Sequence, residues 1–322
     1  MRSPVDLAPR RRGGLRLRHP LIVAAGGGGY GPELLEAVGE EMPGAIVTRS
    51  VTRDARHGHR PPRMALRGDG LISSVGTPNP GLAAMLQRQA PRWARFDVPI
   101  IVSICGEDVD DISALARALE MQPDVAGLEL NLACPDRSRG GEPIGLDVDA
   151  SEVATVTARA ATELPLIVKL TAVVPDIRAI ARAVVAAGAD AVSATAALPA
   201  FALDGTVSGP ALGTTYGGLS GPAIKPVGLR AVWEIAQVVK VPVIGIGGVH
   251  RLEDVLDYLA AGATAVGLAT ATLAEPTLPG RLANELDHWG DEQGAESVDQ
   301  LIGRALPTRR DRGSLRSGPF GR

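Results

Sequence analysis

The stretch Gly127-Leu128-Glu129-Leu130-Asn131-Leu132-Ala133-Cys134-Pro135 predicts a buried strand that ends at an amide side chain and continues into a loop presenting a thiol. Both side chains belong to rare types here, since Asn131 is one of three asparagines and Cys134 is one of two cysteines. A cysteine is usually a small, inert core residue, so residue type alone leaves a structural role open. The role of this pair therefore depends on the fold around it.

The composition indicates a cytoplasmic globular protein. The chain has 322 residues, a net charge of −3 and 3% aromatic residues, which argues against a nucleic-acid surface. No apolar run reaches the length that a bilayer requires, so we expect no membrane span. Two cysteines without a secretory signal are typical of a reducing compartment, and we expect no metal site. The only lysines are Lys169, Lys225 and Lys240, so a lysine inside an apolar run stands out.

Short apolar runs alternate with helical patterns along the chain. The runs are β-branched and apolar on both faces, as in the covered strands of a parallel sheet. Between them, apolar residues recur at helical spacing, as at Ile177, Ile180 and Val184. Asp176 precedes that pattern as an N-cap. Eight alternations predict a (β/α)8 TIM barrel, formed by one domain over residues 1–322. The eight runs are 21–25, 45–48, 99–103, 127–131, 166–170, 191–195, 243–247 and 265–268.

The carboxyl ends of these runs are polar or glycine almost throughout. Active sites of such barrels lie at this end of the strands, often with a phosphate held by backbone amides after the last two. Long insertions follow the second strand (50–98) and the sixth (196–222), and as loops they would cover the barrel mouth. We expect residues 1–14 and 307–322 to be flexible. The strand ends are Gly26, Thr48-Arg49-Ser50, Ser103, Asn131, Lys169, Thr195, Gly247-Gly248 and Ala269-Thr270.

Five motifs are distinctive in the chain: Gly44-Ala45-Ile46-Val47-Thr48-Arg49-Ser50, Asn79-Pro80-Gly81, Glu129-Leu130-Asn131-Leu132-Ala133-Cys134-Pro135, Ile167-Val168-Lys169-Leu170-Thr171 and Gly217-Gly218-Leu219-Ser220-Gly221-Pro222-Ala223-Ile224-Lys225-Pro226. They resemble motifs of the soluble, cysteine-using dihydroorotate dehydrogenases, over about residues 19 to 275. The segment 204–218 is closer to the pyrimidine-binding domain of dihydropyrimidine dehydrogenases. The resemblance implies a (β/α)8 barrel that binds FMN and oxidises or reduces a ring C–C bond.

The resemblance also implies residue roles. The flavin N5 would take a hydride from one substrate ring carbon while Cys134 acts as base on its neighbour, which requires a lowered thiol pKa or an activated carbon acid. Lys169 would stabilise the reduced flavin, and since a buried unpaired ammonium is costly, a purely structural lysine is disfavoured. The implied FMN contacts are Ala25, Gly26, Arg49, Ser50, Ser103, Asn131, Lys169, Thr195, Gly221, Gly247, Gly248, Ala269 and Thr270. The implied substrate contacts are Arg49, Ser73, Ser74, Val75, Gly76, Thr77, Asn131, Ala196 and Ala197.

Departures from the family pattern concentrate on the substrate. The family reads its pyrimidine ring with asparagines, because a side-chain amide can both donate to and accept from the imide edge. Ser73 and Asp136 each stand where an Asn is expected, and Ala196-Ala197 replace an Asn-Thr pair. Arg49 and Ser103 likewise replace a Lys and an Asn. Each buried hydrogen bond that is lost should weaken binding of a pyrimidine imide by about one to a few kcal/mol.

Other functions stay open at this point. A dihydropyrimidine reductase would need a separate subunit with iron–sulfur clusters or FAD, since this chain has too few cysteines to hold a cluster. A non-pyrimidine cyclic substrate would explain Ala196-Ala197, and so would a barrel that binds flavin without turnover. A Schiff-base aldolase would explain Lys169 but neither Cys134 nor the motif at 217–226. By resemblance we also expect a homodimer.

Overall fold

A closed eight-stranded parallel barrel forms the centre of the molecule. The computed structural model describes residues 1–134, 140, 142–206 and 208–307. The barrel strands are β3 (Leu21–Val23), β4 (Ala45–Val47), β7 (Ile100–Ile104), β8 (Gly127–Asn131), β9 (Leu166–Lys169), β10 (Ala191–Ala194), β13 (Val243–Ile246) and β14 (Ala265–Leu268). Each pairs with the next in chain order, and β14 pairs with β3 to close the ring. The predicted (β/α)8 TIM barrel is confirmed.

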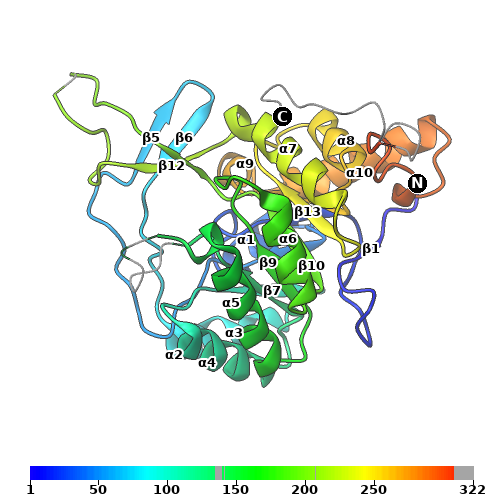
Figure 1. Ribbon diagram of the computed structural model, residues 1–322. Helices are drawn as coiled ribbons and strands as arrows, with labels where there is room; N and C mark the ends of the chain where they lie inside the picture. The colour runs from blue at the N-terminus through cyan, green and yellow to red at the C-terminus, as the bar shows by residue number, and fades with distance from the viewer. Residues whose placement is uncertain (135–139, 141, 207, 308–322) are drawn as a thin grey trace.

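Helices pack around the outside of this barrel, as Figure 1 shows for α4, α5 and α6. The sequence favours them through an apolar stripe and a capping side chain. In α6 the buried positions include Ile177, Ile180 and Val184, and the Asp176 side chain accepts a hydrogen bond from the Arg178 backbone N–H at 3.0 Å, as the N-cap prediction requires. The helices are α1 (Pro32–Val38), α2 (Leu82–Arg88), α3 (Ala90–Trp93), α4 (Val109–Glu120), α5 (Val148–Ala161), α6 (Ile177–Ala186), α7 (Lys225–Ala236), α8 (Leu252–Ala260), α9 (Thr270–Ala274) and α10 (Leu278–Glu292).

The register around β8 brings polar residues of three further strands to neighbouring positions. Glu129 on β8 is paired with Ser103 on β7, and Asn131 is paired with Lys169 on β9. Lys169 is in turn paired with Ser193 on β10. Side chains two residues apart on one strand point to the same face, so Glu129 lies one layer below Asn131. This alignment builds a polar patch at the carboxyl end of an otherwise apolar barrel.

The two long insertions reach the barrel mouth as expected, since residues of both, such as Leu71 and Ala197, line the cavity there. The expectation that they are loops is corrected. They form a four-stranded antiparallel sheet in the order β11-β12-β6-β5, which projects from one side of the barrel in Figure 1. The pairing joins Gly218 to Ser73 and Leu219 to Ile72, so it connects segments that are distant in the sequence, and no local pattern announces it. The four strands are β5 (Met64–Arg67), β6 (Gly70–Ser73), β11 (Leu198–Ala200) and β12 (Gly217–Ser220).

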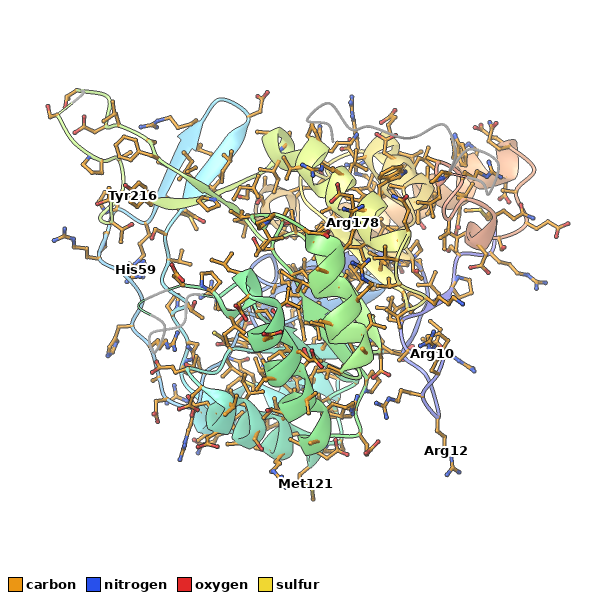
Figure 2. All side chains as sticks on the ribbon, in the orientation of Figure 1. Arg10, Arg12, His59, Met121, Arg178 and Tyr216 are labelled. Atoms are coloured by element: carbon orange, nitrogen blue, oxygen red, sulfur yellow. The ribbon has the colours of Figure 1, made fainter. Side chains whose placement is uncertain are left out.

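The amino-terminal segment is packed, contrary to the flexibility expected for residues 1–14. Strand β1 (Val5–Asp6) pairs with β2 (Arg16–Leu17), and Leu7 and Ala8 are completely buried. The basic composition misled the prediction because the charge lies on the exposed side: Arg12 at the tip points away from the barrel in Figure 2. Residues 308–322 of the predicted flexible tail lie outside the described residues.

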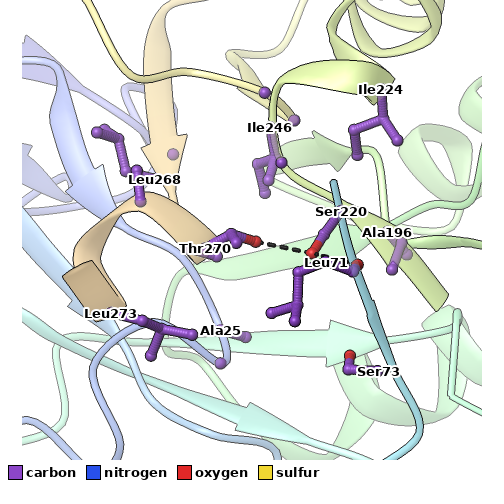
Figure 3. A pocket seen from close by; sticks show the side chains of 18 of the residues that line it. Ala25, Leu71, Ser73, Ala196, Ser220, Ile224, Ile246, Leu268, Thr270 and Leu273 are labelled. Atoms are coloured by element: carbon purple, nitrogen blue, oxygen red, sulfur yellow. Dashed lines mark hydrogen bonds between the residues drawn. The ribbon is translucent and has the colours of Figure 1, made fainter. Parts of the chain in front are cut away.

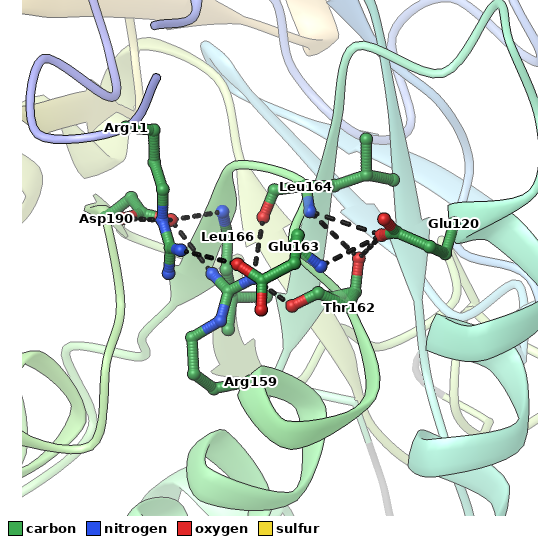
Figure 4. A network of polar contacts seen from close by, with 8 residues as sticks. All are labelled: Arg11, Glu120, Arg159, Thr162, Glu163, Leu164, Leu166 and Asp190. Carbon is green, nitrogen blue, oxygen red and sulfur yellow. Dashed lines mark hydrogen bonds and ion pairs between the residues drawn. The ribbon is translucent and has the colours of Figure 1, made fainter. Parts of the chain in front are cut away.

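A polar network fastens this segment to the amino-terminal end of the barrel (Figure 4). Arg11 Nε donates to Asp190 at 2.8 Å, and Arg159 Nη1 donates to the same carboxylate at 3.0 Å. Asp190 directly precedes β10, and it also accepts from the backbone N–H of Leu166, the first residue of β9, at 2.9 Å. Nearby, Glu120 at the end of α4 accepts from the Thr162 hydroxyl and from two backbone N–H groups.

Candidate active site

A cavity of about 670 Å³ opens at the carboxyl ends of the barrel strands. This volume lies within the usual range of small-molecule sites, about 300–1,000 Å³. Figure 3 shows Ala25 and Thr270 from the barrel with Leu71 and Ser73 from the projecting sheet, and Thr270 Oγ1 donates to Ser220 Oγ at 2.8 Å. Most predicted site residues line it: Ala25, Gly26, Arg49, Ser50, Ser73, Val75, Thr77, Asn131, Cys134, Lys169, Thr195, Ala196, Ala197, Gly221, Gly247, Gly248, Ala269 and Thr270.

A second cavity of about 1,000 Å³ adjoins the first and shares part of its lining. The shared wall includes Val75, Thr77 and Ala197, so these residues separate the barrel cavity from the outer cavity. His59 and Tyr216 line the outer cavity, on the side of the molecule where the sheet projects (Figure 2). We call these spaces the barrel cavity and the outer cavity below.

Three predicted site residues lie elsewhere. Ser74 and Gly76 line the outer cavity, and Ser74 Oγ lies 2.9 Å from His59 Nδ1. Ser103 is completely buried and does not line the barrel cavity; its hydroxyl is 2.8 Å from Ser50 Oγ. Asp136 lies outside the described residues.

Asn131 fixes the turn that carries the thiol. Its Oδ1 accepts from the backbone N–H of Ala133 at 3.1 Å, which closes the strand end into a turn. Its Nδ2 donates to Ser50 Oγ at 2.9 Å and to Cys134 Sγ at 3.5 Å. The amide therefore places Cys134 in the barrel cavity and provides a hydrogen bond that favours the thiolate.

Several groups stabilise the ionised form of Cys134. A hydrogen bond with Cys105 is the largest influence that lowers the pKa of Cys134 to about 7, against the opposing effect of burial. The Thr77 hydroxyl, 3.6 Å from the sulfur, acts in the same direction. The positive charges of Arg56 and Lys169 also lower this pKa. A thiol with such surroundings can act as a base near neutral pH.

Lys169 is buried beside a carboxylate. Its Nζ lies 3.9 Å from Glu129 Oε1, and the two residues are 6% and 1% exposed, so neither charge is left to solvent. Glu129 accepts from Ser103 Oγ and from Ser193 Oγ, each at 3.1 Å. These bonds fix the carboxylate below the cavity floor, and the carboxylate holds a cation at the floor itself.

Glycine backbone forms one end of the cavity, directly after the carboxyl end of β13. Gly247 and Gly248 have φ values of 131° and 74°, which side-chain-bearing residues rarely adopt. A Cβ on Gly248 would come within 2.9 Å of the Lys225 backbone nitrogen, so the chain must be bare there. Lys225 itself begins α7 and is 2.7 Å from Asp257, which is a structural position.

The prediction missed several groups of this site. Glu129 was visible as a charge inside an apolar run, and that signal could have identified it, but its partners on β7 and β10 follow only from the register. Cys105 was visible only as the second cysteine. Met64, Leu71 and Ser220 enter through the projecting sheet, which the sequence did not predict.

Neither a metal cluster nor a membrane helix is found in the part of the chain that the structure describes. No group of three or more His, Cys, Asp or Glu side chains is arranged there to hold a metal ion. No helix there has the length and apolar character needed to cross a bilayer.

Comparison with known proteins identifies the family. A family profile described as dihydroorotate dehydrogenase matches residues 11–289. The chain is 41% identical over 295 residues to the catalytic subunit of dihydroorotate dehydrogenase B (NAD(+)) of Desulforudis audaxviator, covering 92% of this chain and 96% of that protein. It is 39% identical over 293 residues to the protein of the same description from Geotalea uraniireducens, covering 91% and 96%. With its barrel and its cavity at the carboxyl ends of the strands, the chain belongs to the dihydroorotate dehydrogenase family of oxidoreductases.

Proposed function

We propose that this protein is an FMN-dependent oxidoreductase that removes a hydride and a proton from adjacent ring carbons of dihydroorotate or a related cyclic substrate. The observation that carries the proposal is the convergence of Asn131, Cys134 and Lys169 on one cavity. A thiol with a pKa near 7 and a buried cation are the two groups that such a reaction requires, a base and a partner for developing negative charge.

The residues present fit FMN. Gly247 and Gly248, which have positive φ values, line one end of the cavity with Ala269 and Thr270, and backbone of this kind suits a phosphate group. Lys169 supplies a positive charge at the cavity floor, which suits an electron-rich ring edge. FMN, when bound, supplies the hydride acceptor. Gly26, Ser50, Asn131, Thr195 and Gly221 would complete its contacts, and Ser103 would support Ser50 from behind.

Cys134 performs the proton transfer in this proposal. Its sulfur, as the thiolate, takes the proton from one ring carbon while a hydride leaves the neighbouring carbon, so a C=C bond forms between them. Asn131 orients the sulfur through its Nδ2, and Lys169 offsets the negative charge that accumulates in the cavity. In the reducing direction the Cys134 thiol returns the proton.

The substrate end of the cavity is less polar than a pyrimidine imide requires. Ala196 and Ala197 line both cavities, and neither side chain can form a hydrogen bond. Ser73 offers only a short hydroxyl where a longer amide would reach the ring. These walls support a second candidate, a cyclic substrate with fewer hydrogen-bonding groups than dihydroorotate. Dihydropyrimidine reduction stays a third candidate, motivated by the segment 204–218.

We further propose that electrons leave through a separate subunit. Both relatives named above are described as catalytic subunits of an NAD(+) enzyme. This chain has two cysteines, Cys105 and Cys134, which are too few to ligate an iron–sulfur cluster. A subunit carrying such a cluster or FAD would supply that function. Homodimer formation stays a prediction.

Anaerobic titration of the FMN-loaded protein tests the proposal. Dihydroorotate, dihydrouracil and a non-pyrimidine cyclic dihydro compound are added in turn, and bleaching of the flavin absorbance is followed. We expect one of them to bleach the wild-type flavin, and Cys134→Ala and Cys134→Ser to bind FMN but bleach far more slowly. A purified protein that takes up no FMN would contradict the proposal. Rapid reduction of the bound flavin by NAD(P)H alone would contradict the separate subunit.

A further inference from the structure

Thr77 adopts a backbone conformation that its side chain disfavours. Its φ is 49°, and it is the one residue other than glycine with a positive φ among the residues that the structure describes. A β-branched residue in this region is a genuine outlier, because its Cβ crowds the backbone. Such conformations persist where the surrounding structure enforces them, and they concentrate at functional sites.

Asn79 enforces this conformation from below. Its Nδ2 donates to the Thr77 carbonyl oxygen at 3.0 Å, and its Oδ1 accepts from the Gly81 backbone N–H at 2.9 Å and from the Thr52 backbone N–H at 3.2 Å. Asn79 is 7% exposed, so these bonds replace water that cannot reach it. Gly76 precedes Thr77 with a φ of 71°, which lets the chain turn sharply before it. The turn thus holds Thr77 in a backbone conformation that glycine usually adopts.

The result of the turn is a hydroxyl beside the thiol. Thr77 Oγ1 lies 3.6 Å from Cys134 Sγ, and Thr77 lines both the barrel cavity and the outer cavity. The Cys105 thiol also hydrogen-bonds Cys134, but Cys105 is 3% exposed and lines neither cavity. Cys105 can stabilise the thiolate, but it has no direct route to solvent. Thr77, in contrast, both contacts the Cys134 sulfur and lines the outer cavity.

We propose that Thr77 is a positioning residue of the Cys134 base: its hydroxyl hydrogen-bonds the thiolate and connects the sulfur to the outer cavity. This inference rests on the proposed function of Cys134. After Cys134 has taken a proton, the thiol passes it to Thr77 Oγ1 while the hydroxyl proton of Thr77 passes to a solvent water in the outer cavity. Cys134 returns to the thiolate, Thr77 regains its hydroxyl, and one proton reaches solvent.

Charged groups around the thiol come in neutralised pairs. Arg56, which follows β4, lies 2.6 Å from Glu107, and Lys169 on β9 lies 3.9 Å from Glu129 on β8. Each carboxylate reduces the field of its cation at Cys134, which increases the relative weight of the short-range hydrogen bonds. Removing the Thr77 hydroxyl should therefore change the ionisation of Cys134 measurably.

Three variants separate the hydroxyl from the backbone strain. Thr77→Val removes the hydroxyl and keeps the branched shape, and Thr77→Ser keeps the hydroxyl. Thr77→Gly removes the hydroxyl but favours the positive φ, so it should fold at least as stably as the wild type. The rate of alkylation by iodoacetamide is measured against pH in the FMN-loaded protein without substrate, and mass spectrometry identifies the peptide containing Cys134. Cys134→Ser serves as the blank.

We expect the wild-type alkylation midpoint near pH 7. We expect Thr77→Val and Thr77→Gly to raise it by about one pH unit, the typical effect of one hydrogen bond to a charged group. Thr77→Ser, which keeps the hydroxyl, should have the wild-type midpoint.

An unchanged midpoint in Thr77→Gly, with a melting temperature at or above that of the wild type, would overturn the inference. If the alkylation midpoint shifts in Thr77→Val and Thr77→Gly but no substrate bleaches the wild-type flavin, the proposed function fails, while the hydrogen bond between Thr77 and Cys134 is supported. If bleaching occurs with an unchanged pH profile in Thr77→Gly, the inference alone fails.

Discussion

The ammonium of Lys169 and the carboxylate of Glu129 lie 3.9 Å apart on two adjacent barrel strands, both shielded from solvent. The pair sits under the cavity in which we place the flavin. Glu129 moderates the positive charge of Lys169, and the hydroxyls of Ser103 and Ser193 hold Glu129 in place. Under the proposed function, stability and flavin chemistry are therefore coupled at this point, because each charge of the pair compensates the other.

Glu129→Gln is expected to reduce the free energy of unfolding by about 3 kcal/mol, since it leaves a buried ammonium unpaired. The Gln side chain can still hydrogen-bond to Ser103 and Ser193, so the loss of stability measures the effect of removing the charge. Urea unfolding measures it. Glu129→Gln combined with Lys169→Met should recover part of the loss, and a double variant less stable than the single one would contradict the pairing.

In the FMN-loaded Glu129→Gln variant we also expect a higher flavin reduction potential, because the positive charge of Lys169 is no longer offset by a carboxylate.

Flavin reduction by substrate is expected to depend on the ionisation of Cys134. Its lowered pKa of about 7 means that the thiolate, the form acting as base, predominates above that pH and is lost below it. The reductive half-reaction should rise with pH and level off above neutrality, as stopped-flow bleaching can measure. Cys134→Ser should be slower by about 10²-fold or more, because the serine hydroxyl is a far weaker base at these pH values. A pH-independent wild-type rate would contradict the assignment.

The alanine pair is expected to weaken recognition of a pyrimidine. Ala196→Asn with Ala197→Thr adds hydrogen-bonding groups to the wall shared by the two cavities. If dihydroorotate is the substrate class, the double variant should bind orotate about tenfold more tightly per hydrogen bond gained. Perturbation of the flavin spectrum by orotate gives the dissociation constant. Ala196→Leu with Ala197→Val is the matched control for size, and equal tightening in that control would contradict recognition through hydrogen bonds.

The amino-terminal end of the barrel offers a test of stability against pH. The Thr162 hydroxyl, followed by the backbone N–H groups of Glu163 and Leu164, lowers the pKa of Glu120 below its ordinary 4.5. A lowered pKa stabilises the fold fully above 4.5, and the stabilisation is lost as the pH falls through the lowered value. Glu120→Gln should therefore cost about 1 kcal/mol at pH 7 and progressively less in acid.

Thermal unfolding at several pH values measures that difference. Glu152→Gln, which replaces an exposed carboxylate on α5, is the control and should change little. A penalty for Glu120→Gln that grows as the pH falls would have the wrong sign and would contradict the linkage.

The sequence predicts the barrel well because each strand corresponds to a short apolar run that can be recognised without its neighbours. Each apolar run lies within a residue or two of an observed strand, as with 99–103 and Ile100–Ile104. The projecting sheet escaped prediction because β6 pairs with β12 across a long stretch of chain, and neither strand has a strong pattern of its own. The packing of residues 1–14 escaped it because Leu7 and Ala8 sit among arginines that dominate the composition.

The site divides in the same way. The roles of Asn131, Cys134 and Lys169 were proposed from the motifs, and the structure places their side chains on one cavity. Ser103 was expected at the cofactor but lies behind Ser50, because the residue type does not say which layer of the barrel a side chain occupies. Cys105 was not expected near Cys134, since the two thiols come from different strand ends and the parallel pairing of β7 with β8 brings them together.

The pairing of β6 with β12 places the wall between the two cavities partly on a sheet separate from the barrel. Ser73 and Gly218 are register partners in this sheet outside the barrel, and Ala197 directly precedes β11 of the same sheet. Under the proposed function, mutations in this sheet would change which substrate the protein accepts without altering β8 and β9, which position Cys134 and Lys169. The proposed substrate specificity and the proposed redox chemistry are therefore separable by mutation.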